Sequence, residues 1–178
     1  MALVRAATPH EFPHDAFGDL LTANAEYAQA YASADLTGWA AKGLAVITCM
    51  DSRIDPLAVL GMRPGDVKIL RNAGARVTDD VLRTLVLATY LLGVDRVLVM
   101  PHTGCKMASG EEEDIHQAIW EQAGVDTRSV EIRTVVDQQA ALVTDVTRIR
   151  AYPLLPDHLV VGGAILDLDT GRILPQDV

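Results

Sequence analysis

Three side chains that can bind a metal ion fall directly after two apolar segments. Cys49 closes the run GLAVITC, and His102 and Cys105 follow the run DRVLVMP. Zinc prefers thiolate and imidazole ligands, and three protein ligands with an open fourth position are typical of a catalytic site. These residues therefore predict a zinc ion that activates water for attack on a small carbon-centred electrophile.

Simpler interpretations exist for the same residues. A His-x-x-Cys spacing also fits a buried free cysteine beside an ordinary histidine, and Cys49 could instead serve a thiol enzyme. Two cysteines make no disulfide framework, and the chain has no Cys-x-x-Cys pair, which argues against redox chemistry. The placement of both cysteines at strand ends favours the metal site.

Asp51 and Arg53 follow Cys49 closely, in the sequence CMDSR. A carboxylate so near a metal can itself take the fourth coordination position, and a bidentate pair with Arg53 would hold it away. Asp51 would then accept a hydrogen bond from water at the metal. The alternative is a surface ion pair that contributes under about 1 kcal/mol. The neighbouring ligand favours the catalytic interpretation.

Strands and helices alternate along most of the chain. Strands are expected at 43–49, 66–70, 95–101 and 131–136, with a final hairpin at 159–174. This order predicts an α/β fold with a mostly parallel central β-sheet flanked by helices. Ligands of such sheets bind beyond the carboxyl ends of the strands. The loops that carry Cys49 and His102 therefore meet if the first and third strands are neighbours.

Capping residues mark the expected helices. These run from Phe17 to about Ala34, from Asp55-Pro56 to near Gly61, from Thr78 to about Leu92, from about Glu111 to Gln122, and onward from Asp137. Asp and Thr cap free amides at helix starts, and proline suits the first helical position. The acidic run at 111–114 fits a helix N-terminus, with a metal site as the alternative.

The composition fits a single domain over residues 1–178. Hydrophobic residues make up 49% of the chain, enough for a sizeable core. A formal net charge of −9 argues against binding to nucleic acid or anionic lipid. No apolar segment has the features of a signal peptide or the length of a membrane span. We expect a soluble cytoplasmic protein with no nucleic-acid or membrane partner.

Three motifs in combination resemble the β-class carbonic anhydrases. They are Cys-Met-Asp-Ser-Arg at 49–53, Arg-Asn-Ala-Gly at 71–74 and His-Thr-Gly-Cys at 102–105. The resemblance covers nearly the whole chain, and the short length is similar to the compact prokaryotic branch. It implies a carbonic anhydrase, or carbonate dehydratase, which is a carbon–oxygen lyase. Such an enzyme reversibly hydrates carbon dioxide to bicarbonate and a proton through attack by zinc-bound hydroxide.

The resemblance also implies roles for individual residues. One Zn²⁺ per chain would be held by Cys49, His102 and Cys105, with Asp51 and Arg53 as the catalytic dyad.

Gly74 and Lys106 are the residues expected at the substrate pocket. The resemblance implies that Gly74 lies in a loop near it. Lys106 departs from the family, in which glycine usually follows the second cysteine. Lys106 can bring a charge to the pocket mouth, and the alternative is a solvated side chain. Arg71 and Arg76 are expected either along the pocket approach or in structural pairs within the dimer.

The family forms dimers that often pair into tetramers. A homodimer or homotetramer is therefore expected, with the arm and helix of residues 1–34 packed on a partner subunit. His116 and His158 are candidate proton shuttles, against the alternative of ordinary hydrogen-bonded or exposed histidines. His10 and His14 are expected to be residues of the loose N-terminal arm, with a metal site there as the alternative.

Two other functions fit the same ligands. Carbonyl sulfide and carbon disulfide resemble carbon dioxide in shape and electrophilicity, and enzymes that hydrolyse them occur among close relatives of the compact branch. A non-catalytic zinc protein that senses bicarbonate would not need Asp51 and Arg53, so this pair favours an enzyme.

Overall fold

The computed structural model describes residues 12–32 and 36–178, which divide into two compact units. The first unit, up to Leu36, contains helix α1 (His14–Ala30). No residue of α1 is buried, and several of its apolar side chains are exposed, among them Phe17, Leu20, Leu21 and Tyr27. His10 and most of the expected arm lie outside the described residues. None of the described helices is long and apolar enough to cross a membrane.

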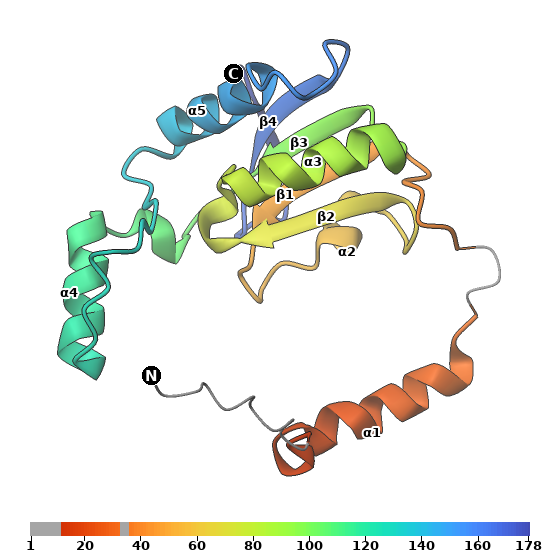
Figure 1. The fold of residues 1–178 in the computed structure, drawn as a ribbon, viewed down its shortest axis with the longest axis horizontal. Coiled ribbons are helices and arrows are strands. Elements are labelled where there is room, and N and C mark those ends of the chain that lie inside the picture. Colours follow the sequence, from red (N-terminus) through yellow and green to blue (C-terminus); the bar gives the residue numbers. More distant parts are fainter. Residues whose placement is uncertain (1–11, 33–35) are drawn as a thin grey trace, which may run out of the picture. The chain divides into compact units, whose positions relative to one another are not determined.

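The second unit, Thr37–Val178, contains one five-stranded sheet in its described residues (Figure 1). The strands are β1 (Leu44–Cys49), β2 (Val67–Asn72), β3 (Arg96–Met100), β4 (Val160–Leu166) and β5 (Ile173–Gln176). Their order is β2-β1-β3-β4-β5, with every pair parallel except β4 and β5. The mostly parallel sheet, the pairing of the first strand with the third, and the C-terminal hairpin are confirmed.

Two apolar cores cover the two faces of the sheet. Helices α3 (Asp79–Leu91) and α5 (Gln138–Arg150) pack on one face against residues such as Ile47 of β1. Helix α2 (Pro56–Leu60) packs on the other face, where Val46 belongs to the core. All six residues of β1 are buried, and those from Leu44 to Ile47 belong to the two cores in alternation. This central strand carries Cys49 at its end.

Side-chain caps begin three of the helices, as predicted. Asp55, Thr78 and Asp137 each accept a hydrogen bond from the backbone amide three residues later, at 3.2, 3.4 and 3.0 Å. Gly61 ends α2 with a φ of +63°, in the left-handed region that glycine adopts without strain. These local signals determine where the helices begin and where α2 ends. The order of the strands then brings the strand-end loops together.

The predicted strand at 131–136 is wrong. This segment is not a strand and lies beside helix α4 (Glu112–Ala123) (Figure 1). The amides of Ile132 and Arg133 donate to the Glu112 carboxylate at 2.9 and 3.0 Å. Arg133 also has a φ of +60°, which interrupts an extended chain. The segment therefore bonds to a side chain of α4, and its place in the sheet is taken by β4.

Candidate metal centre

Cys49, His102 and Cys105 form a buried cluster at the carboxyl ends of β1 and β3. Their ligand atoms all lie within 4.8 Å of one another, and the two sulfurs are 3.9 Å apart. The strands that precede them are hydrogen-bonded neighbours, which is why residues more than fifty positions apart converge. The three residues predicted as ligands are thus brought together in a geometry that could hold a metal ion.

The His102 ring is oriented as a metal ligand requires. Its Nδ1 lies 2.8 Å from the Thr103 carbonyl oxygen, and when Nδ1 donates this bond, Nε2 is left as an acceptor. Nε2 is buried and has no hydrogen-bond partner among the described residues. A buried polar atom without a partner is costly, so a cation at this position would stabilise the ring.

The donor set fits zinc. Two thiols and one imidazole are ligands that zinc prefers, and three of them leave a fourth position open. Burial raises the pKa of the Cys105 thiol, so a bound cation is needed to hold it as a thiolate near neutral pH. Gln138, at the start of α5, donates to the His102 carbonyl at 2.8 Å. Sequence reasoning missed Gln138, because this contact depends on where α5 packs.

Asp51 and Arg53 form a bidentate pair beside the cluster. Arg53 Nε donates to Oδ1 at 2.9 Å and Nη2 to Oδ2 at 2.7 Å, while the Arg53 amide adds a bond to Oδ1 at 3.0 Å. The hydrogen bonds from the Arg53 side chain hold the pKa of Asp51 well below its usual range. Asp51 Oδ2 also lies 3.7 Å from His102 Nε2. The carboxylate is therefore ionised, restrained and close to the ligands.

A hollow of about 540 Å³ opens over this cluster. Its lining combines the polar group with apolar side chains: Cys49, Met50, Asp51, Ser52, Arg53, Ala73, Cys105, Lys106 and Met107. Lys106 is exposed there, where the sequence had placed it at the pocket mouth or in solvent. Gly74 does not line this hollow among the described residues. A Cβ on Gly74 would lie 3.3 Å from Met107 Cβ, so Gly74 leaves room for a lining residue.

Arg71 and Arg76 occupy different settings. Arg76 forms an ion pair of 2.7 Å with Asp145 of α5, and both side chains are mostly buried. This pair ties the loop after β2 to a helix of the same chain, so Arg76 has a structural contact within the subunit, and pairing across a dimer stays a prediction. Arg71 instead donates to backbone carbonyls of the loop that carries Cys49 and Asp51.

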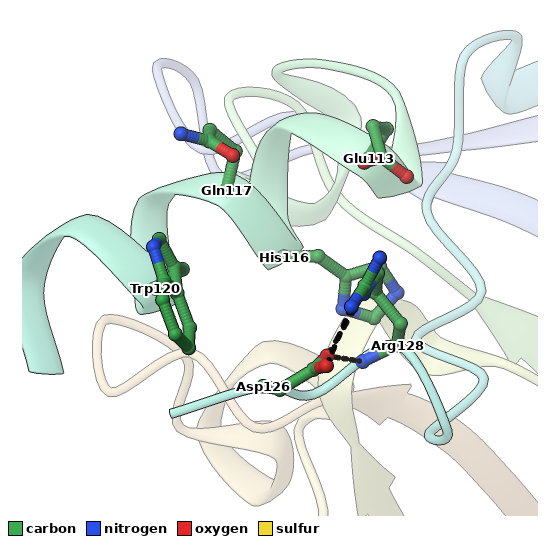
Figure 2. A pocket seen from close by; sticks show the side chains of 6 residues that line it. All are labelled: Glu113, His116, Gln117, Trp120, Asp126 and Arg128. Carbon is green, nitrogen blue, oxygen red and sulfur yellow. Dashed lines mark hydrogen bonds and ion pairs between the residues drawn. The ribbon is translucent and has the colours of Figure 1, made fainter. Parts of the chain in front are cut away.

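His116 lies in a different hollow, of about 260 Å³, between α4 and the segment that follows it (Figure 2). The hollow is lined by Glu113, His116, Gln117, Trp120, Asp126 and Arg128, and none of these is a candidate ligand. His116 Nδ1 lies 2.8 Å from Thr127 Oγ1, and its Nε2 lies 3.7 Å from Glu112. The structure therefore favours an ordinary hydrogen-bonded histidine. His158 is exposed.

Comparison with known proteins shows that this chain is similar to carbonic anhydrases. Residues 44–173 match the protein family described as carbonic anhydrase. Beta-carbonic anhydrase 1 of Mycobacterium tuberculosis is 32% identical over 156 residues, which are 87% of this chain and 94% of that protein. The crystal structure of carbonic anhydrase from Streptococcus mutans has a TM-score of 0.85 and 32% identity, and the match covers 94% of this chain and 100% of the other.

A relative with another activity is also similar. Carbon disulfide hydrolase of Acidithiobacillus thiooxidans is 28% identical, over 73% of this chain and 75% of that protein. The family match spans most of the chain, and the identity to the mycobacterial enzyme extends along nearly all of it. The chain therefore belongs to the β-class carbonic anhydrase family.

Proposed function

We propose that the protein is a zinc-dependent carbonic anhydrase that reversibly hydrates carbon dioxide to bicarbonate and a proton. The observation that carries this proposal is the bidentate pair of Asp51 and Arg53 directly beside the buried Cys49, His102 and Cys105. A structural zinc site has no need of such a pair, whereas hydration needs a fixed acceptor for a proton of the attacking water.

The metal role belongs to Cys49, His102 and Cys105, which would hold one Zn²⁺ per chain. When bound, zinc supplies a Lewis acid that makes water a nucleophile near neutral pH. His102 contributes the Nε2 atom that is otherwise unpaired, with its ring fixed through the Thr103 carbonyl.

Asp51 orients the attacking water by accepting a hydrogen bond from it. The low pKa of its carboxyl keeps it an acceptor throughout the neutral range. Arg53 fixes the carboxylate with three hydrogen bonds and is itself held by the Gly104 carbonyl, 3.2 Å from Nη2. This restraint prevents Asp51 from turning to occupy the open coordination position.

The remaining lining residues suit the substrate and the product. Met50, Ala73 and Met107 give the hollow an apolar side for carbon dioxide, which is small and uncharged. Lys106 gives its mouth a positive charge that favours the bicarbonate anion.

The direct test is a hydration assay on protein of measured zinc content. We expect stopped-flow carbon dioxide hydration well above the buffer rate, in proportion to the bound zinc. Zinc-loaded protein that hydrates no carbon dioxide would contradict the proposal and would favour a non-catalytic bicarbonate-sensing role.

A second candidate function is hydrolysis of carbonyl sulfide or carbon disulfide. The similarity to a carbon disulfide hydrolase favours it, together with the ligand set, which serves either substrate class. Hydrogen sulfide release from each compound, measured beside carbon dioxide hydration on the same preparation, separates the two. A larger kcat/KM for a sulfur compound than for carbon dioxide would make the second candidate the main activity.

The assembly is part of the same proposal. We infer a homodimer or homotetramer in the cytoplasm, in which residues 1–178 act as one domain and α1 packs on a partner subunit. The absence of any buried residue in α1 supports this, because exposed apolar groups such as Leu20 and Leu21 need a covering surface. Light scattering of the full chain should give a dimer or larger, and an active monomer would contradict it.

A further inference from the structure

Arg71 reaches from β2 over the carboxyl end of the neighbouring strand. It lies opposite Thr48 of β1, and its guanidinium extends to the loop that follows. Nε donates to the Cys49 carbonyl at 2.9 Å, and Nη2 donates to the Asp51 carbonyl at 2.7 Å. One planar group thus joins the backbone of a metal-ligand candidate to the backbone of the catalytic aspartate.

The strand pairing of β1 with β2 ends at Cys49. The last register pair of β1 and β2 is Cys49 with Asn72, and the Met50 amide donates to the Asn72 carbonyl at 3.0 Å. The carbonyl of Asp51 accepts one turn hydrogen bond of 3.1 Å from the amide of Ile54. The other bond to this carbonyl comes from Arg71. Arg71 thus adds two side-chain hydrogen bonds to the few backbone bonds that hold the chain where it leaves β1.

Arg71 does not belong to the described lining of the hollow and contacts the backbone of the loop that carries Asp51. The described residues that line the hollow include Asp51 and Arg53 but not Arg71. Its two donors face backbone carbonyls and leave the Asp51 carboxylate to Arg53. A shift of about 1 Å in a catalytic group can cost about 100-fold in rate, so control of this backbone path controls turnover.

We propose that Arg71 is a positioning residue that fixes the chain between Cys49 and Asp51, and thereby the direction of the Asp51 carboxylate. The proposal rests on the proposed hydration activity for its kinetic readout, whereas the loop conformation can be measured without turnover. This role differs from both of those that the sequence left open for Arg71.

The test compares Arg71→Met and Arg71→Lys with Arg96→Met in the full zinc-loaded chain. Arg96 is a matched control, because its Nη2 also donates to a backbone carbonyl, that of Lys42 at 3.0 Å, at the opposite end of the sheet. We expect Arg71→Met to keep its zinc and lose about 100-fold in kcat/KM for carbon dioxide. Arg71→Lys should recover part of this loss, since an ammonium can bond the same carbonyls, and Arg96→Met should match the wild type.

Hydrogen exchange supplies the readout that does not need turnover. The amides of Arg53 and Ile54 are bonded to Asp51, so they should exchange faster in Arg71→Met and at the wild-type rate in Arg96→Met. Wild-type kcat/KM and exchange in Arg71→Met, or equal losses in Arg71→Met and Arg96→Met, would overturn the proposal. If Arg71→Met does not fold, wild-type values of both quantities in Arg71→Lys would overturn it instead.

The two proposals fail separately. If the zinc-loaded wild type hydrates no carbon dioxide, the proposed function fails, and exchange at Arg53 and Ile54 alone decides the positioning role. Unchanged exchange in Arg71→Met would then contradict that role.

Discussion

The described chain contains two Asp-x-Arg units with the same internal geometry in different surroundings. In Asp51-Ser52-Arg53 and in Asp126-Thr127-Arg128, the arginine Nε donates to Oδ1 at 2.9 and 3.0 Å, and Nη2 donates to Oδ2 at 2.7 Å in both. In each unit the arginine side chain holds the pKa of the aspartate well below its usual range. The hydrogen bonds within the two pairs therefore do not distinguish the units, although Arg53 also donates to the Gly104 carbonyl at 3.2 Å.

The neighbouring histidines distinguish the two units. His102, beside Asp51, is buried, and its Nε2 faces two thiols and has no hydrogen-bond partner in the part of the chain that the structure describes. His116 lines the same hollow as Asp126 (Figure 2). It is already hydrogen-bonded to the Thr127 hydroxyl and lies 3.7 Å from Glu112. The Asp51 side chain is also more enclosed, at 18% exposed against 49% for Asp126. Asp-x-Arg is therefore a local structure that three residues can form, and the adjacent ligands give it a catalytic role.

The largest difference should follow from removal of each histidine. His102→Ala removes a ligand, so zinc content should fall from about one per chain to near zero and hydration to the buffer rate. His116→Ala, the matched variant, should keep its zinc and its activity. Metal analysis with the hydration assay decides the matter, and stoichiometric zinc in His102→Ala would remove His102 from the ligand set.

Removal of each aspartate charge gives the next contrast. Asp51→Asn should keep zinc and lose about 100-fold or more in kcat/KM, because a positioned proton acceptor contributes about 10²–10⁴-fold. Asp126→Asn should stay within about twofold of the wild type, since that unit faces no ligand. Similar losses in the two variants would show that Asp-x-Arg serves stability alone at both places.

A third Asp–Arg pair, that of Asp145 and Arg76, is expected to contribute to the stability of the fold and not to catalysis. Asp145 and Arg76 are 2.7 Å apart with side chains 5% and 14% exposed, so Asp145→Ala leaves a mostly buried guanidinium unpaired. Loss of one partner of a buried pair costs about 3 kcal/mol, which should appear in the free energy of unfolding. Asp80→Ala is the control, because Asp80 and Arg83 are exposed and their pair contributes under about 1 kcal/mol. Equal unfolding free energies of the two variants would contradict the structural role of Arg76.

The smallest expected effect concerns the charge at the mouth of the catalytic hollow. Lys106→Met should weaken inhibition of hydration by bicarbonate about two- to fivefold, as suits an exposed charge–charge contact of under about 1 kcal/mol. Lys42→Met changes the net charge equally at the amino end of β1 and should leave this inhibition constant unchanged. Identical inhibition of both variants would return Lys106 to the solvated interpretation.

Much of the fold was predictable because its signals are local. The caps at Asp55, Thr78 and Asp137 need only a side chain and an amide three residues away. The segment at 131–136 has the composition of a strand, but its amides bond to Glu112, which lies about twenty residues earlier. Strand composition could not reveal that competing partner.

The residues of the site also divide into those that the sequence could predict and those that it could not. Cys49, His102 and Cys105 were predictable as a group because strand-end loops of neighbouring parallel strands meet. The bonds from Arg71 to two carbonyls were not predictable, since backbone acceptors leave no pattern in the sequence. Gln138 was missed for the same reason: its partner is the His102 carbonyl.

The most direct test of the central claim is the rate of ¹⁸O exchange between carbon dioxide and water, measured on zinc-loaded Arg53→Ala and Arg128→Ala. Each variant removes the arginine of one unit and frees the aspartate that it restrains. We expect Arg128→Ala to exchange at the wild-type rate, while Arg53→Ala keeps its zinc and exchanges about 100-fold more slowly. Wild-type exchange in Arg53→Ala would contradict the claim that the pair beside the ligands controls catalysis.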